Sequence, residues 1–273
     1  MSKTKRNRYP VEFKAKAALE AIKGEQAVSE LGSRYRLHPN MITNWKQQSR
    51  TDCCWVSQGK YSMEDMYVIH EDPEFVVVVK PSGLLSVPGR GPENLDCVSE
   101  RVKARYPGCI EQPAVHRLDM DTSGLLVVAR TKEVHRNLSI QFQEGEVTKR
   151  YIAILDGELD GEEGVVELPF RLDIDNRPYQ IYDPVHGKVG ITHWKKLLVK
   201  NGKTRIEFRP VTGRTHQLRV HSASEHGLGI PIVGDPLYGT GTGPGLLKLH
   251  ACYLSFAHPR TGESIEFRSE PLF

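Results

Sequence analysis

Beyond Tyr67 the sequence consists mostly of short β-rich runs that Gly and Pro residues separate, and this pattern limits the folds open to the chain. The first two runs, residues 67–70 and 75–80, flank the turn-forming segment Glu71-Asp72-Pro73-Glu74. Later runs of the same kind predict strands at 125–130, 149–159, 165–170, 192–199, 204–211 and 263–268. Helical patterns are fewer, and we expect helices over 95–107 and 132–144. The body is therefore predicted to be an α+β domain, a mixed and mostly antiparallel sheet with helices packed on one side.

Composition supports a globular protein. At 273 residues, 38% hydrophobic and 26% charged, the chain can bury a real core. No run approaches the roughly 18 apolar residues of a membrane span, and the basic start does not resemble a secretory signal. The five cysteines are an odd number without a CxxC pair, so we expect a cytoplasmic location and neither a disulfide framework nor a zinc site.

Charge divides the chain into two parts. Residues 1–50 carry 11 Lys+Arg against 4 Asp+Glu, a net charge of +7, whereas the remainder has a net charge of −4. A basic head and a mildly acidic body are better interpreted separately.

The head has the periodicity of three short helices, at 11–25, 27–35 and 37–48, the last two joined by a tight turn. This spacing predicts a helix-turn-helix segment over residues 1–50. The stretch YPVEFKAKAALEAIKG…VSELGSRYRLHPNMITNWKQQ resembles the start of the small DNA-binding protein of insertion-element transposases. The resemblance implies that the third helix lies in a DNA major groove, and the residues presented there would be Asn40, Thr43, Asn44 and Lys46. The alternative is a small helical bundle with a solvated basic face.

Residues 51–65 match neither neighbour and are interpreted as a junction. No transposase catalytic domain follows the head, and Met63 and Met66 are positions where a shorter protein could begin. The hypothesis is that an insertion-element fragment was fused upstream of an otherwise complete enzyme occupying residues 66–273.

The stretch AVHRLDMDTSGLLVVAR, residues 114–130, places His, Arg and two acids directly before an apolar strand. Asp119 is the candidate reactive group, because a carboxylate serves as a general acid, a general base or a nucleophile. Beside an arginine it would stay ionised. The alternative is an Asp that caps a turn.

A second polar block, PVTGRTHQLRVHS, follows a predicted strand and begins with a glycine-led turn. It concentrates donors in a short span, which favours a bound ligand or a buried acid as their partner; they are Arg214, His216, Gln217, Arg219 and His221. The alternative is a helix start whose polar residues face solvent. The spacing of the two histidines matches no zinc pattern, so no metal is expected.

Together with KRYIAILDG, which contributes Tyr151, these blocks resemble the RluA-type family of pseudouridine synthases. The resemblance covers about Tyr67 to Phe273 and includes, in the family's order, KPSGLLSVPG, HRLDMDTSG, KRYIAILDG, LPFRLDIDNRPYQ, PVTGRTHQLRVH, GDPLYG and LKLHACYLSFAHPRTGE. It implies the family's fold and the isomerisation of uridine to pseudouridine in RNA without a cofactor. The NRPYQ block resembles the small subfamily that acts on a tRNA anticodon stem-loop and a 23S rRNA hairpin.

The resemblance also implies residue roles. Asp119 becomes the catalytic carboxylate, Arg219 its pairing arginine, and Tyr151 the active-site tyrosine that stacks on uracil. Arg117 becomes the residue that enters the space left by the flipped uridine, and Arg214, His216 and Gln217 become substrate contacts. Along an extended segment Arg117 and Asp119 point to one side and His116 and Leu118 to the other. The residues expected to shape the following turn are Thr122, Ser123 and Gly124.

The negative body is at odds with RNA binding, which depends on phosphate contacts. Local positive charge from Lys149, Arg150, Arg214 and Arg219 is expected to compensate. The protein is expected to be a monomer. Two rival hypotheses remain: a DNA-binding protein with an inert body, and an RNA-binding factor that keeps the fold without catalysis.

Overall fold

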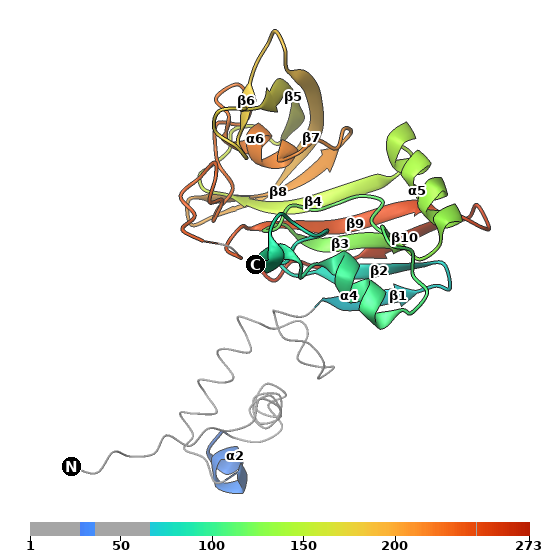
Figure 1. The fold of residues 1–273 in the computed structure, drawn as a ribbon. Helices are drawn as coiled ribbons and strands as arrows, with labels where there is room; N and C mark the ends of the chain where they lie inside the picture. The colour runs from blue at the N-terminus through green and yellow to red at the C-terminus, as the bar shows by residue number, and fades with distance from the viewer. Residues whose placement is uncertain (1–27, 36–65, 244) are drawn as a thin grey trace. The chain divides into compact units, whose positions relative to one another are not determined.

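The computed structural model describes residues 28–35, 66–243 and 245–273 (Figure 1). The larger of its two units runs from Met63 to Pro271, and helix α2 (Val28–Tyr35) belongs to the other unit. Helix α2 agrees with the helix expected at 27–35. The other two expected helices of the head lie outside the described residues.

The larger unit contains strands and a few short helices. Its strands are β1 (Tyr67–Glu71), β2 (Phe75–Lys80), β3 (Ser123–Ala129), β4 (Thr148–Leu155), β5 (Glu163–Leu172), β6 (Gln180–Tyr182), β7 (Lys188–Lys200), β8 (Lys203–Pro210), β9 (Leu249–Ala257) and β10 (Ser264–Arg268). Its helices are α4 (Val98–Arg105), α5 (Lys132–Glu144) and α6 (Gln217–Ala223), with a short 3-10 turn η2 (Pro92–Asn94). Among the described residues no helix is both long and apolar enough to cross a membrane.

The described strands form one sheet in the order β1-β2-β3-β9-β4-β8-β7-β5-β6, with β10 added beside β9 (Figure 1). Neighbours pair antiparallel except β3 and β9, which run parallel. The predicted mixed, mostly antiparallel sheet is thus confirmed. Strand β9, which the sequence analysis did not identify, lies at its centre and joins the N-terminal strands to β4.

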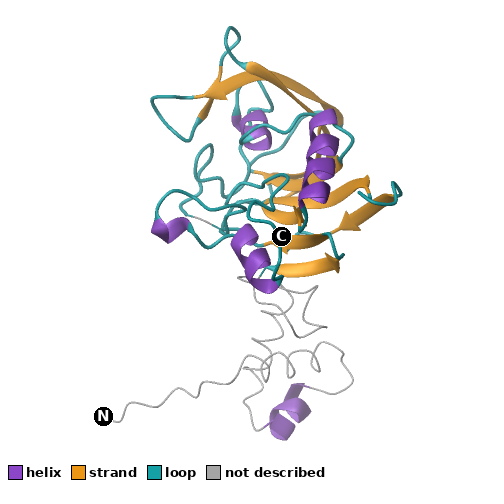
Figure 2. Ribbon diagram, turned by 45° about the vertical axis from the view of Figure 1, so that its right-hand side comes forward, coloured by secondary structure: helices purple, strands orange, loops and turns teal. Residues whose placement is uncertain are grey.

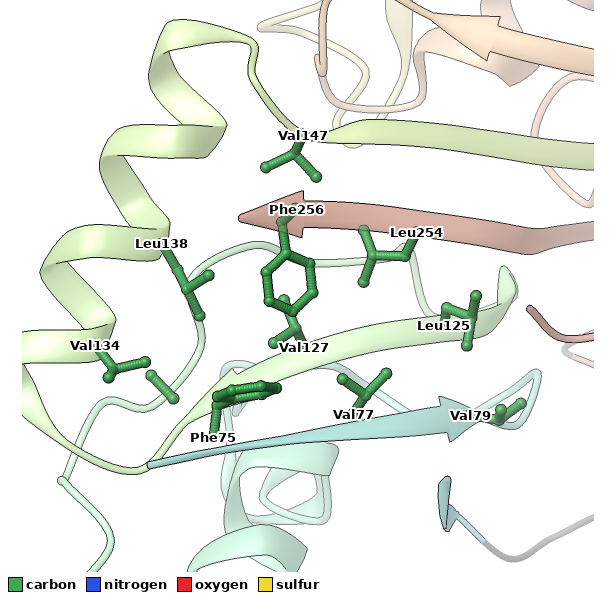
Figure 3. Close-up of a cluster of buried hydrophobic side chains, with 11 residues drawn as sticks. Phe75, Val77, Val79, Leu125, Val127, Val134, Leu138, Val147, Leu254 and Phe256 are labelled. Atoms are coloured by element: carbon green, nitrogen blue, oxygen red, sulfur yellow. The ribbon is translucent and has the colours of Figure 1, made fainter. Parts of the chain in front are cut away.

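The expectation that the helices pack on one side of the sheet is wrong. Successive residues of a strand point to opposite faces. Phe75 and Val77 of β2 pack with Val134 and Leu138 of α5 (Figure 3), whereas Val76 packs against α4 on the other face. Strand β2 is buried at all six positions because both of its faces are covered.

Helix α5 occupies the range expected for it, residues 132–144, because both of its ends are specified locally. The Thr131 hydroxyl accepts a hydrogen bond from the Val134 amide at 3.3 Å, and Gly145 ends the helix in the left-handed conformation at φ 76°. Val134 and Leu138 then lie on one helical face and reach the core.

The approach of β3 to β9 depends on a glycine. Gly124 has φ 113°, and a Cβ atom placed there would lie 2.4 Å from the Ala251 carbonyl oxygen. Only glycine permits this contact. Gly124 therefore shapes the chain after Asp119, as expected, and fixes where the HRLD segment enters the sheet. The loops gather along one side of the sheet (Figure 2). Several of them line the cavities described next.

Candidate active site

Loops from distant parts of the chain line one cavity of about 650 Å³, here called the active-site cavity. Residues 85–89 follow β2, residues 117–121 precede β3, and residues 236–243 lie between α6 and β9. His216 and Arg219 complete the wall from the start of α6, and Pro178 comes from the turn between β5 and β6. The volume lies within the range of small-molecule sites and is sufficient for a nucleoside.

The HRLD segment alternates only in part as the sequence analysis expected, because Leu118 also lines the active-site cavity. Arg117 and Asp119 line the active-site cavity. His116 points the other way, stacks on Phe142 at a ring distance of 4.4 Å, and accepts a hydrogen bond from the Val127 amide. Leu118 is buried, and the Ser86 hydroxyl holds its backbone by donating to its carbonyl and accepting from its amide. The segment is therefore fixed on one side and open to the cavity on the other.

Asp119 and Arg219, one hundred residues apart in sequence, meet in this cavity. Arg219 Nη1 lies 3.7 Å from Asp119 Oδ2. The Arg219 side chain is 3% exposed and the Asp119 side chain 20% exposed, so the arginine is rigidly enclosed while the carboxylate faces the cavity. The proximity that the sequence analysis expected between these two groups is present.

Asp235 is one of the site residues that the sequence analysis missed. Arg219 donates to it twice, from Nε at 2.8 Å and from Nη2 at 2.6 Å, and the pair is buried. Burial alone would raise the pKa of Asp235, but the bonds from Arg219 and from the amides of Leu237 and Tyr238 hold that pKa below its usual value. Arg219 is thus oriented by Asp235 and offers Nη1 to Asp119. The only sequence signal was the GDPLYG block, which had been given no role.

His216 lies at the end of a second hydrogen-bonded chain. The Gln180 amide donates to the Tyr238 hydroxyl at 2.8 Å, and that hydroxyl lies 2.9 Å from His216 Nδ1. With the hydroxyl proton assigned to the bond with Nδ1, the imidazole proton lies on Nε2. Burial lowers the pKa of His216, which favours the neutral ring. The backbone of His216, at the start of α6, has φ 56°, which is uncommon for a residue other than glycine.

Tyr151 lies on β4 at a break in its register with β9 and packs between two parts of the core, and it is not among the residues that line either cavity. Burial and the nearby charge of Asp119 raise the pKa of its hydroxyl. The phenol is therefore protonated at neutral pH, which suits it as a ring that stacks or as a proton donor better than as a free base.

Two expected substrate contacts differ in position. Gln217 is 3% exposed and lines neither cavity; its amide accepts from Thr212 and from the Arg214 backbone and donates to Ile191 and Thr192. It shapes the loop before α6, so its expected contact with substrate is corrected to a positioning role. Arg214 stacks over the Phe170 ring at 4.7 Å and lines a second cavity beside the first.

The alternative of a helix start with solvent-facing polar residues is also wrong, because Gln217, Arg219 and His221 are all buried. The expectation that Lys149 and Arg150 add positive charge beside Arg214 and Arg219 is also corrected. Lys149 and Arg150 line neither cavity, and Arg150 lies 4.0 Å from Glu207 and stacks on Tyr253.

Lys80, at the end of β2, was not singled out from sequence. Its side chain is fully buried, and Nζ donates to the carbonyls of Pro81, Leu84 and Met120 at 2.7–2.9 Å. Burial lowers its pKa to about 7, opposed by the charges of Asp121 and Asp119. Lys80 thus ties the loop after β2 to the loop that carries Asp119.

Comparison with known proteins defines the class of this fold and site. The family model described as RNA pseudouridylate synthase matches residues 74–224, and the chain belongs to this family. It is 44% identical over 210 residues to the dual-specificity RNA pseudouridine synthase RluA of Pasteurella multocida, covering 76% of this chain and 93% of that protein. The corresponding protein of Yersinia pestis is 43% identical over 212 residues, covering 76% of this chain and all of that protein.

Solved structures agree. Human RNA pseudouridylate synthase domain containing 1 superposes with a TM-score of 0.61 and 28% identity, over 78% of this chain and 86% of that one. The body is therefore a pseudouridine synthase, an isomerase that acts on RNA, and the rival hypothesis of a DNA-binding protein with an inert body is not favoured. A family model described as transposase matches residues 3–65, in agreement with the resemblance of the head.

Proposed function

We propose that Asp119 is the group that reacts with uridine and that Arg219, oriented by Asp235, keeps it ionised and in place. The observation that carries this proposal is the 3.7 Å approach of Arg219 Nη1 to Asp119 Oδ2 at the wall of a nucleoside-sized cavity. The arginine opposes proton uptake by a carboxylate in a partly dry site. An arginine already fixed by a second carboxylate needs little rearrangement during the reaction.

The reaction breaks the N1–C1′ bond of uridine and forms a C5–C1′ bond after the uracil has turned. The proton on C5 is lost and N1 gains one, so atoms and electrons balance without a redox partner. Asp119 acts either by attack at C1′ or by removing a ribose proton to give a glycal. Tyr151 packs on the uracil ring, and its protonated hydroxyl is suited to hold or return a proton rather than to abstract one unaided.

Arg117 acts on the RNA rather than on the reacting bond. A stacked uridine must leave the stack to reach Asp119, which costs a few kcal/mol. Arg117 is exposed and lies two residues from Asp119 on the same side of an extended segment. Its planar guanidinium can fill the vacated position by stacking on neighbouring bases. His216, with its Nε2 proton free, is proposed to donate a hydrogen bond to the bound nucleotide.

The proposed substrates are the anticodon stem-loop of tRNA and a hairpin of 23S rRNA. Relatives named as dual-specificity RNA pseudouridine synthases support this choice, because the chain spans nearly all of their length. The test is tritium release from transcripts of both RNAs that carry 5-tritiated uridine, with Asp119→Asn as the inactive control. Release from both by the wild-type protein is expected. Release from neither would contradict the proposed substrates.

For the head we propose a transposase-like helix-turn-helix over residues 1–50, a junction at 51–65 and a catalytic domain at 66–273 that acts as a monomer. The head would bind duplex DNA weakly through its basic residues. A mobility shift with duplex DNA, comparing the whole chain with a deletion of residues 1–62, tests this. The deletion is expected to abolish the shift and keep uridine isomerisation; loss of isomerisation and solubility would contradict the fusion hypothesis.

A further inference from the structure

The turn between β5 and β6 carries the NRPYQ block of the sequence and ends at the start of β6. Asp173 builds this turn. Its carboxylate accepts hydrogen bonds from the Asn176 side chain at 2.9 Å and from the amides of Asp175 and Asn176 at 3.1 and 3.3 Å. The Asp173 amide donates to the Tyr179 carbonyl at 2.9 Å, which closes the turn. The position of Tyr179 is therefore set by hydrogen bonds within the turn itself.

Tyr179 is held outward beside the active-site cavity. It is 38% exposed, and its neighbour Pro178 lines that cavity. The Tyr179 ring meets the Tyr238 ring edge to face, with ring centroids 5.8 Å apart and an angle of 86° between the planes. A perpendicular contact of this kind covers at most one face of the Tyr179 ring. The exposed part of the ring is thus free to be covered by a planar ligand.

Tyr179 is also the outer end of a line of rings that leads into the active-site cavity. The Tyr238 ring lies 5.7 Å from the His216 ring, and the Arg219 guanidinium lies over the Tyr238 ring at 5.3 Å. Both His216 and Arg219 line the active-site cavity. A nucleotide in contact with Tyr179 is therefore a near neighbour, along the RNA strand, of the nucleotide that reaches Asp119.

The chemistry of an exposed aromatic ring at this place suits a second nucleobase. When a uridine is flipped out, the bases beside it lose a stacking partner. Unpaired bases of RNA are bound by stacking on aromatic side chains, and every base has a π face that can take part. Such a contact supplies affinity without reading the edges of the base.

We propose that Tyr179 stacks on the base of an unpaired nucleotide close to the flipped uridine. The residue then favours RNA loops that can present an unpaired base at that position, whatever its identity. This inference rests on the proposed function, because it takes a uridine in the active-site cavity as its point of reference. Tyr179 acts on binding, whereas the reacting carboxylate and its arginine act on the chemical step.

The test compares a variant without the ring, Tyr179→Ala, with one that keeps it, Tyr179→Phe. The matched control is Tyr182→Ala, since Tyr182 is 37% exposed on β6 and lines neither cavity. Affinity for the tRNA stem-loop and the 23S rRNA hairpin is measured together with the single-turnover rate at saturating RNA. Tyr179→Ala should bind about 10- to 100-fold more weakly than the wild type, the effect of losing one stacked base. Tyr179→Phe and the control should bind within about threefold of the wild type.

The split between affinity and rate separates stacking from a structural role. If Tyr179 only supported Tyr238, its removal would disturb His216 and change the rate at saturating RNA and the pH dependence of that rate. Stacking instead predicts a rate at saturation within about threefold of the wild type. Thermal unfolding of the three variants verifies that they fold.

An abasic nucleotide, placed in turn at each position beside the target uridine, identifies the stacked base. At one position it should weaken binding to the wild type by the same factor as Tyr179→Ala does. The same abasic RNA should cause little further loss in Tyr179→Ala, because the contact is already absent. In the control Tyr182→Ala the abasic position should cost as much as in the wild type.

Several results would overturn the proposal: equal affinities of Tyr179→Ala and Tyr182→Ala, a loss in Tyr179→Phe as large as in Tyr179→Ala, or abasic losses that are the same in wild type and Tyr179→Ala at every position. Failure of the wild type to bind either RNA would overturn it as well. If the abasic coupling is found but the wild type isomerises no uridine, the stacking role stands and the proposed role of Asp119 fails.

Discussion

The active-site cavity and the basic cavity, the second cavity that Arg214 lines, share Arg117, Pro178 and His216. They differ in whether their charged side chains are paired. In the first, Arg219 is enclosed between Asp235 and Asp119. In the second, Arg90, Arg177 and Lys188 stand exposed without acidic partners among the described residues. A buried, fully bonded pair fixes geometry for chemistry, whereas exposed unpaired cations act over a distance and attract a polyanion. The difference supports the proposal that the enclosed Arg219 positions the reacting carboxylate, whereas the exposed cations are placed to attract RNA.

The largest effect is expected from Asp235→Asn, which removes the carboxylate that holds Arg219. Removing one partner of a buried ion pair costs about 3–5 kcal/mol, and we expect isomerisation to slow at least about 100-fold because Arg219 loses its orientation. Glu266→Gln is the control, since Glu266 pairs with Arg268 at the surface and should cost below about 1 kcal/mol. Urea denaturation and single-turnover rates measure both. Equal losses of stability and of rate in the two variants would contradict the proposed role of Asp235 in orienting Arg219.

Arg117 lines both cavities, so its replacement should affect both the binding of RNA and the reaction. Arg117→Ala should slow isomerisation about 100-fold by raising the cost of flipping, which is a few kcal/mol. Arg117→Lys keeps the charge but lacks the planar stacking surface, so it should restore affinity more than rate. Fluorescence of 2-aminopurine beside the target uridine reports unstacking. If the alanine variant unstacks the RNA to the same extent as the wild type, the proposed role of Arg117 in base flipping is contradicted.

Tyr238→Phe is expected to have a smaller effect, about tenfold on rate, comparable to the loss of one hydrogen bond. Without the hydroxyl that donates to Nδ1, the neutral ring of His216 is less favoured and its pKa should rise toward the ordinary value. The rate should therefore fall at a higher pH than in the wild type as the solution is acidified. Single-turnover rates between pH 5 and 8 test this, and superimposable profiles would contradict the assigned tautomer.

The smallest predicted effect concerns stability rather than catalysis. Burial lowers the pKa of His116 to about 3 and those of His221 and His250 to about 4. Between pH 6.5 and 4 the unfolded chain then binds more protons than the folded one, so the free energy of unfolding falls as the pH drops.

His221 offers the cleanest variant for this effect, because neither of its ring nitrogens has a hydrogen-bond partner among the described residues. His221→Leu should lessen the loss of stability between pH 7 and 5 by about 1 kcal/mol. Urea denaturation at the two pH values provides the measurement. An unchanged difference would mean that His221 is not neutral and buried as described.

Local patterns in the sequence predicted much of this fold. The bounds of α5 and β2 follow from a cap, a terminal glycine and a continuous apolar run, all of which act over a few residues. The faces on which α4 and α5 pack did not follow, because both faces of β2 are apolar and the sequence does not say which helix covers which. Strand β9 was missed because its apolar residues are interrupted by His250, Cys252 and Ser255.

The candidate site, like the fold, was predicted from the sequence only in part. Asp119 and Arg219 were indicated by motifs, but the bonds of Asp235 to Arg219 and of Lys80 to three carbonyls form only when loops meet. The basic cavity was also predicted only in part: Arg117 and Arg214 were indicated by motifs, but Arg90, Arg171, Arg177 and Lys188 join them only when loops meet.

The proposed role of Asp119 is best measured by the rate of tritium release by Asp119→Asn at saturating RNA under single turnover. Asparagine keeps the size of the side chain but can neither attack C1′ nor accept a proton as a carboxylate does. We expect a rate at least about 10⁴-fold below that of the wild type, with RNA affinity within about threefold because the cations that line the basic cavity are unchanged. A variant that released tritium within about tenfold of the wild-type rate would show that another group carries out the reaction.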